Sequence, residues 1–128
     1  MVAGTAELGT LFAKAHEAGL AAGAAAAPAP MVVSEHDNPL DDASPAVQSW
    51  VEPAGLCGFA WVTLRPGTSR AAKFAKKKLG ARAAYGGGTQ LWVHEFGQSV
   101  TRKGAYARAF ATVLSEAGFT AYAGSRLD

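Results

Sequence analysis

Hydrogen-bond donors and cationic side chains in the second half of the chain could form an anion-binding site. Serine hydroxyls, a glutamine amide, lysine and arginine all donate hydrogen bonds to phosphate or carboxylate oxygens. The residues of this kind that follow a predicted strand or begin a predicted helix are Arg65, Ser69, Gln98, Ser99, Lys103, Ser125 and Arg126. If the strands run parallel, these residues share the carboxyl edge of the sheet, where open α/β folds bind ligands. The first hypothesis is therefore a nucleotide or other phosphate-containing ligand at this edge, with helix capping and loop closure as the alternative role of the same residues.

Four cations on one predicted helix give a second hypothesis, which is nucleic-acid binding. Arg70, Lys73, Lys76 and Lys77 gather on its outer face and could neutralise backbone phosphates. Residues 1–55 hold one lysine and seven acids, whereas residues 56–128 hold eleven lysines and arginines and three acids. Such asymmetry can indicate an anionic partner for the basic half. Two alternatives stay open: a solvated helix face, and two halves of the chain that neutralise each other.

Patterns for catalysis are weak, so a binding protein without a cofactor is favoured over an enzyme. Cys57 or Ser99 could act as a nucleophile with His94 as its base. However, Cys57 opens an apolar strand, where a buried and inert thiol is the common case. His94 alternates with two aromatic residues, Trp92 and Phe96, which is typical of a packed strand histidine.

No metal or phosphate-loop motif is recognised. His36 with Asp37, Asp41 and Asp42 matches neither a zinc pattern nor an EF-hand loop, so a solvated acidic loop is expected there. Gly86–Gly88 lacks the lysine and hydroxyl residue of a P-loop and is expected to form a turn.

Periodicity and capping residues predict the order of the elements. The first half is expected to contain a helix from Thr5 to about Ala26, a short strand at Met31–Val33, and an irregular segment at Ser34–Pro53 with a turn of helix at Ala46–Val51. The second half is expected to contain strands at Cys57–Leu64 and Leu91–Phe96, a helix from Ser69 to Leu79 between them, a helix that begins near Ser99 and ends before Gly118, and a strand from Phe119.

This alternation predicts one small domain of the α/β or α+β class over residues 1–128. A mixed or partly parallel sheet of about four strands would pack with three helices. Residues 1–33 would form the N-terminal helix and short strand, 34–55 an acidic and proline-rich loop, and 56–128 the strand–helix core. Residues 81–90 leave an alternative open, because Gly86–Gly88 could close a hairpin and reverse one strand.

The segment Cys57–Leu64, CGFAWVTL, is similar to the aromatic octamer of RNA-recognition-motif domains, in which sheet aromatics stack on bases. Cys57 stands where a lysine or arginine is expected, and Leu64 replaces the final aromatic residue. The element order also differs, since that fold has one helix and one strand after its octamer and this chain has two of each. We therefore expect Phe59 and Trp61 to be core residues beneath a helix.

Composition predicts a soluble, cytoplasmic protein. A single cysteine cannot form an intrachain disulfide bond, which suits a reducing compartment. The Ala/Gly-rich run at 18–27 is too short to span a membrane, and no basic segment precedes an apolar one at the N-terminus. Protein–protein interaction, with a host protein or a second copy of the chain, is the third functional hypothesis.

Residues 56–128 resemble small uncharacterised proteins encoded by tailed bacteriophages. The resemblance rests on GQS followed by a lysine four residues after the serine, on YARAFATVL, and on the terminal AYAGSRLD, with a GFAWV strand and a glycine-rich turn upstream. It implies a phage accessory protein that acts in the bacterial cytosol by binding a host protein, a nucleic acid or a nucleotide. It implies no catalytic activity.

Overall fold

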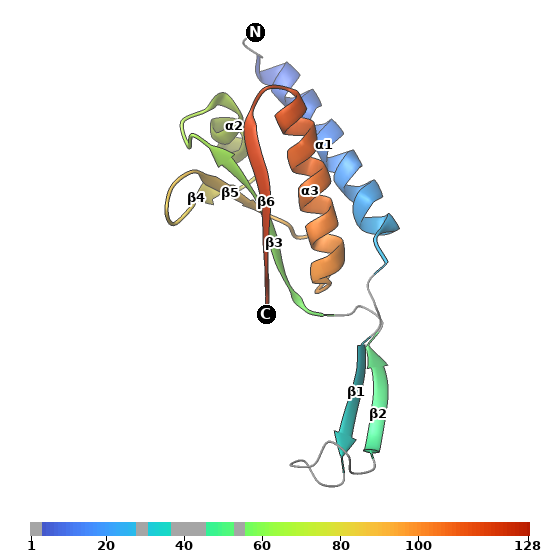
Figure 1. The fold of residues 1–128 in the computed structure, drawn as a ribbon. Helices are drawn as coiled ribbons and strands as arrows, with labels where there is room; N and C mark the ends of the chain where they lie inside the picture. The colour runs from blue at the N-terminus through green and yellow to red at the C-terminus, as the bar shows by residue number, and fades with distance from the viewer. Residues whose placement is uncertain (1–3, 28–30, 37–45, 53–55) are drawn as a thin grey trace.

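The computed structural model describes residues 4–27 and 56–128 in full and the backbone of residues 31–36 and 46–52. Its elements are α1 (Thr5–Ala25), β1 (Met31–His36), β2 (Ala46–Glu52), β3 (Gly58–Arg65), α2 (Arg70–Lys78), β4 (Arg82–Ala83), β5 (Thr89–Trp92), α3 (Val100–Glu116) and β6 (Thr120–Leu127). The strands β1 and β2 pair as an antiparallel hairpin, and the other four strands form a separate sheet (Figure 1). The fold is therefore of the α+β class.

The four-stranded sheet has the order β4-β5-β3-β6, and every neighbouring pair is antiparallel. The prediction of a mixed or partly parallel sheet is wrong. Each strand–helix–strand connection does join strands that run the same way, but a strand of opposite direction lies between them. The glycine-rich turn is the cause, because Gly86, Gly87 and Gly88 all adopt positive φ angles and close the β4–β5 hairpin. The order β3-α2-β4-β5-α3-β6 is thus a β-α-β-β-α-β unit.

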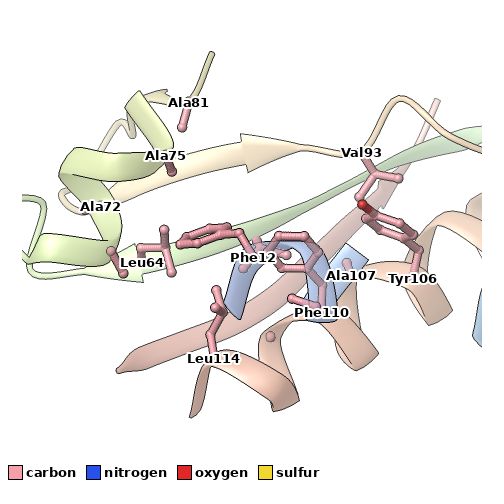
Figure 2. Close-up of a cluster of buried hydrophobic side chains, with 14 of the residues drawn as sticks. Phe12, Leu64, Ala72, Ala75, Ala81, Val93, Tyr106, Ala107, Phe110 and Leu114 are labelled. Carbon is pink, nitrogen blue, oxygen red and sulfur yellow. The ribbon is translucent and has the colours of Figure 1, made fainter. Parts of the chain in front are cut away.

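One face of this sheet packs against the helices. Ala60, Val62 and Leu64 of β3 are buried there, because alternate residues of a strand point to the same face. Phe12 of α1 stacks on Phe74 of α2, with 5.0 Å between the ring centroids, and meets Phe110 of α3 at 5.8 Å. Small alanines of α2 complete the same core, as Figure 2 shows.

Glycines allow α1 to approach α3 closely (Figure 1). A Cβ atom at Gly19 would lie 2.6 Å from the Tyr106 ring, and one at Gly23 would lie 2.2 Å from the Phe96 ring. The guanidinium of Arg102 donates hydrogen bonds of 2.9 Å to the carbonyl oxygens of Gly23 and Ala24. These carbonyls belong to the last turn of α1 and have no partners within the helix. Arg102 therefore ties the start of α3 to the end of α1.

The same substitution at two positions of α1 tests this packing. Gly19→Ala should lower the free energy of unfolding by about 1–2 kcal/mol, because overpacking against the buried Tyr106 ring exceeds the gain in helix propensity. Gly9→Ala should raise it by about 0.5–1 kcal/mol, since a Cβ there meets only Phe74, at 3.9 Å. Urea denaturation followed by circular dichroism measures both. Equal shifts of the same sign would contradict the packing described.

Most predicted elements are confirmed, but the segment Ser34–Pro53, predicted to be irregular, contains the end of β1 and all of β2. Ser69 caps α2 and Ser99 caps α3 through their side-chain oxygens, and Gly118 has a positive φ angle after α3. The predicted turn of helix at Ala46–Val51 is wrong, because these residues lie in β2. The strand expected at Leu91–Phe96 begins earlier and ends at Trp92. Residues 37–45, which include the acidic-loop aspartates, lie outside the described residues.

Candidate functional site

The sheet topology separates the residues that the anion hypothesis grouped together. Arg65 lies at the carboxyl end of β3, and Ser69 caps the helix that follows. Gln98, Ser99, Lys103, Ser125 and Arg126 lie near the other end of β3. The eight-residue strand spans roughly 23 Å. The seven residues therefore do not share one edge of the sheet, because β5 and β6 run antiparallel to β3 and end at its opposite edge.

The residues at the beginning of β3 differ in their freedom to bind a ligand. Ser99 is buried, and its Oγ already accepts a hydrogen bond from the backbone N–H of Arg102. The carbonyl oxygen of Gln98 accepts from the N–H of Gly58, which continues the sheet. Ser125 and Arg126 are exposed on β6, where they pair with Ala60 and Phe59. Ser99 therefore acts as a helix cap, whereas Arg126 stays accessible.

The predicted basic face of α2 is exposed to solvent. Arg70, Lys73, Lys76 and Lys77 are all on its surface. Three of these cations, together with Lys78, line a shallow hollow of about 340 Å³ against the start of α1. They form a positive surface on the helical side of the domain.

The face of the sheet turned away from the core, called the open face below, carries three large aromatic side chains. Phe59 and Trp61 alternate with the buried residues of β3, and Trp92 lies opposite Trp61 in the β3–β5 register. The centroid of the Trp92 ring lies 5.0 Å from that of Trp61 and 6.0 Å from that of Phe59. All three are partly exposed. This corrects the expectation that Phe59 and Trp61 lie beneath a helix.

A glycine makes room for the Trp61 ring on the neighbouring strand. Gly124 of β6 pairs with Trp61, and a Cβ atom at Gly124 would fall 2.6 Å from the indole. The Trp61 ring therefore extends over β6 and stays partly exposed. We call Phe59, Trp61 and Trp92 the aromatic platform.

Cations border the aromatic platform at the beginning of β3. The guanidinium carbon of Arg126 lies 5.3 Å from the Phe59 ring centroid and 6.0 Å from that of Trp92. The Nζ atom of Lys103, a residue that is only 7 % exposed, lies 6.0 Å from the Phe59 ring. These distances fall within the range of cation–π interactions. Two of the residues predicted for anion binding, Lys103 and Arg126, are thus brought together beside aromatic rings.

Another cation, Arg65, lies at the other end of the open face. Nε of Arg65 donates a hydrogen bond of 2.5 Å to the Tyr122 hydroxyl. The glycine-rich turn lies against the same side chain, since Cβ atoms at Gly87 and Gly88 would fall 3.3 and 3.0 Å from Arg65. Positive charge is therefore held at both ends of β3, on the face that carries the aromatic platform.

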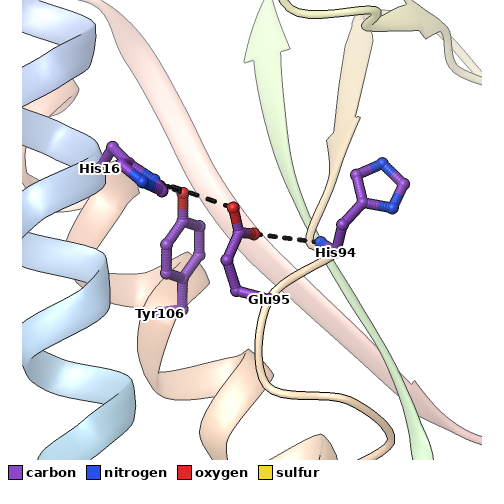
Figure 3. A network of polar contacts seen from close by, with 4 residues as sticks. All are labelled: His16, His94, Glu95 and Tyr106. Carbon is purple, nitrogen blue, oxygen red and sulfur yellow. Dashed lines mark hydrogen bonds and ion pairs between the residues drawn. The ribbon is translucent and has the colours of Figure 1, made fainter.

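A polar cluster links α1, α3 and the segment after β5 on the helical side of the sheet (Figure 3). Nδ1 of His16 lies 2.6 Å from the Tyr106 hydroxyl and 3.8 Å from a carboxylate oxygen of Glu95. The other carboxylate oxygen of Glu95 accepts a hydrogen bond from the backbone N–H of His94. Burial, together with the negative charge of Glu95, raises the pKa of Tyr106 well above its usual value. The phenol therefore stays protonated and can donate to His16.

Sequence reasoning missed this cluster and the open face for different reasons. The cluster joins residues ninety positions apart, so no local pattern contains it. The open face did carry a signal, the alternation of Phe59 and Trp61 with smaller apolar residues.

Within the described part of the chain, no three His, Cys, Asp or Glu residues could hold a metal ion, and no helix combines the length and apolarity that crossing a bilayer needs. The chain matches no protein-family model, no curated protein and no solved structure.

Proposed function

We propose that the protein binds single-stranded nucleic acid on the open face of its sheet. The observation that supports this most strongly is the aromatic platform with Arg126 beside it. Unpaired bases stack on aromatic side chains whatever their sequence, and cations next to the rings contact the phosphates. The strands β3 and β5, which carry the platform, are the two central strands of the sheet. RNA-recognition motifs likewise stack bases on the aromatics of a four-stranded sheet.

Cations at both ends of β3 favour a strand of nucleic acid over a single nucleotide. Arg126 and Lys103 lie near one end and Arg65 near the other, about one strand length apart. A mononucleotide could contact only one of these groups, whereas an extended backbone could pass both. A duplex is disfavoured because its bases are already stacked. The resemblance to bacteriophage proteins supports binding as the role, and we propose a phage accessory function on that basis.

Arg126→Ala tests the proposal directly. It should weaken binding of a fluorescein-labelled oligothymidylate of about 12 nucleotides by about fivefold and lower the slope of log affinity against log salt by about one. Fluorescence anisotropy at several salt concentrations measures both values. Arg108→Ala is the matched control, because Arg108 is an exposed arginine of α3 outside the open face, and it should leave binding unchanged.

Two further measurements distinguish this proposal from binding on the basic face of α2 and from binding of a single nucleotide. The double variant Lys73→Glu/Lys77→Glu reverses charge on α2 and should reduce affinity only modestly. If it abolishes binding while Arg126→Ala has no effect, the basic face of α2 is the binding surface. If thymidine monophosphate competes as strongly as the oligonucleotide, the ligand is a nucleotide. Absence of oligonucleotide binding at low salt refutes the proposal.

A further inference from the structure

A second candidate site lies on the helical side of the sheet, in a pocket of about 400 Å³ between α1, α2, α3 and the end of β5. Phe12, Phe74, Leu91 and Phe110 supply apolar walls, and polar groups gather at one end. The volume lies in the range of small-molecule sites, which combine apolar walls with a few convergent polar groups. We infer that this pocket binds a small hydrophobic amine, with the ammonium group at Glu95 and the apolar body against the aromatic walls.

The negative charge in the pocket determines which head group a ligand should carry. Glu95 is the only aspartate, glutamate, lysine or arginine among the described residues that line the pocket. One of its carboxylate oxygens accepts the His94 N–H at 3.1 Å, while the other lies 3.8 Å from His16 Nδ1, beyond hydrogen-bond distance. A carboxylate can accept about four hydrogen bonds, so Glu95 retains acceptor sites. An ammonium group supplies three donors and the opposite charge.

The remaining groups favour a cation over an anion or a neutral ligand. The Tyr106 hydroxyl is engaged with His16, and burial raises the pKa of this phenol, so it adds no negative charge. The pocket is bordered by Trp92, Phe12 and Phe110, which offer the apolar body of the ligand an aromatic surface to pack against. A carboxylate ligand would instead be repelled by Glu95. This inference does not rest on nucleic-acid binding, although Trp92 borders both the pocket and the open face.

Three probes with the same phenylethyl body and different head groups test the inference. These are 2-phenylethylamine, 2-phenylethanol and 3-phenylpropionate, each titrated into the full-length protein by isothermal titration calorimetry. The amine should bind about tenfold more tightly than the alcohol, because a charge-assisted hydrogen bond is gained, and the carboxylate should bind most weakly. Amide chemical shifts of Gly9, His94 and Glu95 should move on addition of the amine, because these residues line the pocket.

Glu95→Gln provides the decisive variant. The amide oxygen of glutamine can still accept the His94 N–H, so the loop geometry is kept while the charge is removed. The amine should lose about tenfold in affinity and become equal to the alcohol. Glu116→Gln, at an exposed glutamate on α3 outside this pocket, should change nothing. The inference is overturned by any of three results: an amine affinity that Glu95→Gln leaves unchanged, equal binding of amine and carboxylate, or no saturable amine binding in the low-millimolar range.

Discussion

Phe12→Ala is expected to lower the free energy of unfolding by about 3–5 kcal/mol, the largest stability change predicted for this protein. Phe12 is only 4 % exposed, and it contacts Phe74 of α2 and Phe110 of α3 in one aromatic group. Removing the ring therefore leaves a cavity at the point where the three helices meet. Urea denaturation monitored by circular dichroism measures the loss.

Phe59→Ala is the matched comparison, because it removes the same ring from the other face of the sheet. The Phe59 side chain is only partly buried, so its loss should cost about 1–2 kcal/mol. A markedly smaller cost than that of Phe12→Ala supports the assignment of Phe59 to the open face. Equal costs for the two variants would instead place Phe59 in the core, as the sequence alone suggested.

The expectation that Phe59 and Trp61 are core residues shows which part of the fold sequence patterns can predict. Alternation along β3 correctly divides its residues between two faces. The alternation does not say which face of β3 the helices cover. The general preference for burying large aromatic side chains favoured the face with Phe59 and Trp61, which is the wrong face. The helices in fact pack on Ala60, Val62 and Leu64, where small and branched side chains allow close approach.

Local signals predicted the helices well because their causes are local. The oxygens of Ser69 and Ser99 accept first-turn N–H groups, and Gly118 adopts the left-handed conformation that ends α3. Strand direction depends instead on a distant event, the reversal of the chain at Gly86–Gly88. Once that turn closes a hairpin, β3 lies between strands of opposite direction. The antiparallel sheet divides the residues predicted for anion binding between the two ends of β3, and Lys103 and Arg126 remain together at one of them.

Trp61→Ala is expected to lower the affinity for single-stranded nucleic acid by about tenfold to a hundredfold. The Trp61 ring lies 5.0 Å from the Trp92 ring, passes over Gly124 and is partly exposed, so it is available to an unpaired base. Each base stacked on an aromatic ring contributes roughly 1–3 kcal/mol to binding. Fluorescence anisotropy with the same labelled oligothymidylate measures the change, and thermal denaturation confirms that the variant is folded at the assay temperature.

The salt dependence of the Trp61→Ala variant distinguishes stacking from charge neutralisation. Removing an uncharged ring does not change how many counterions the nucleic acid releases when the protein binds. The slope of log affinity against log salt should therefore stay at its wild-type value. Arg126→Ala should reduce that slope, because it removes a phosphate contact. Tyr85→Ala serves as the aromatic control, since Tyr85 is fully exposed in the β4–β5 turn and outside the platform. If Tyr85→Ala and Trp61→Ala weaken binding equally, or if neither does, the open face does not stack bases.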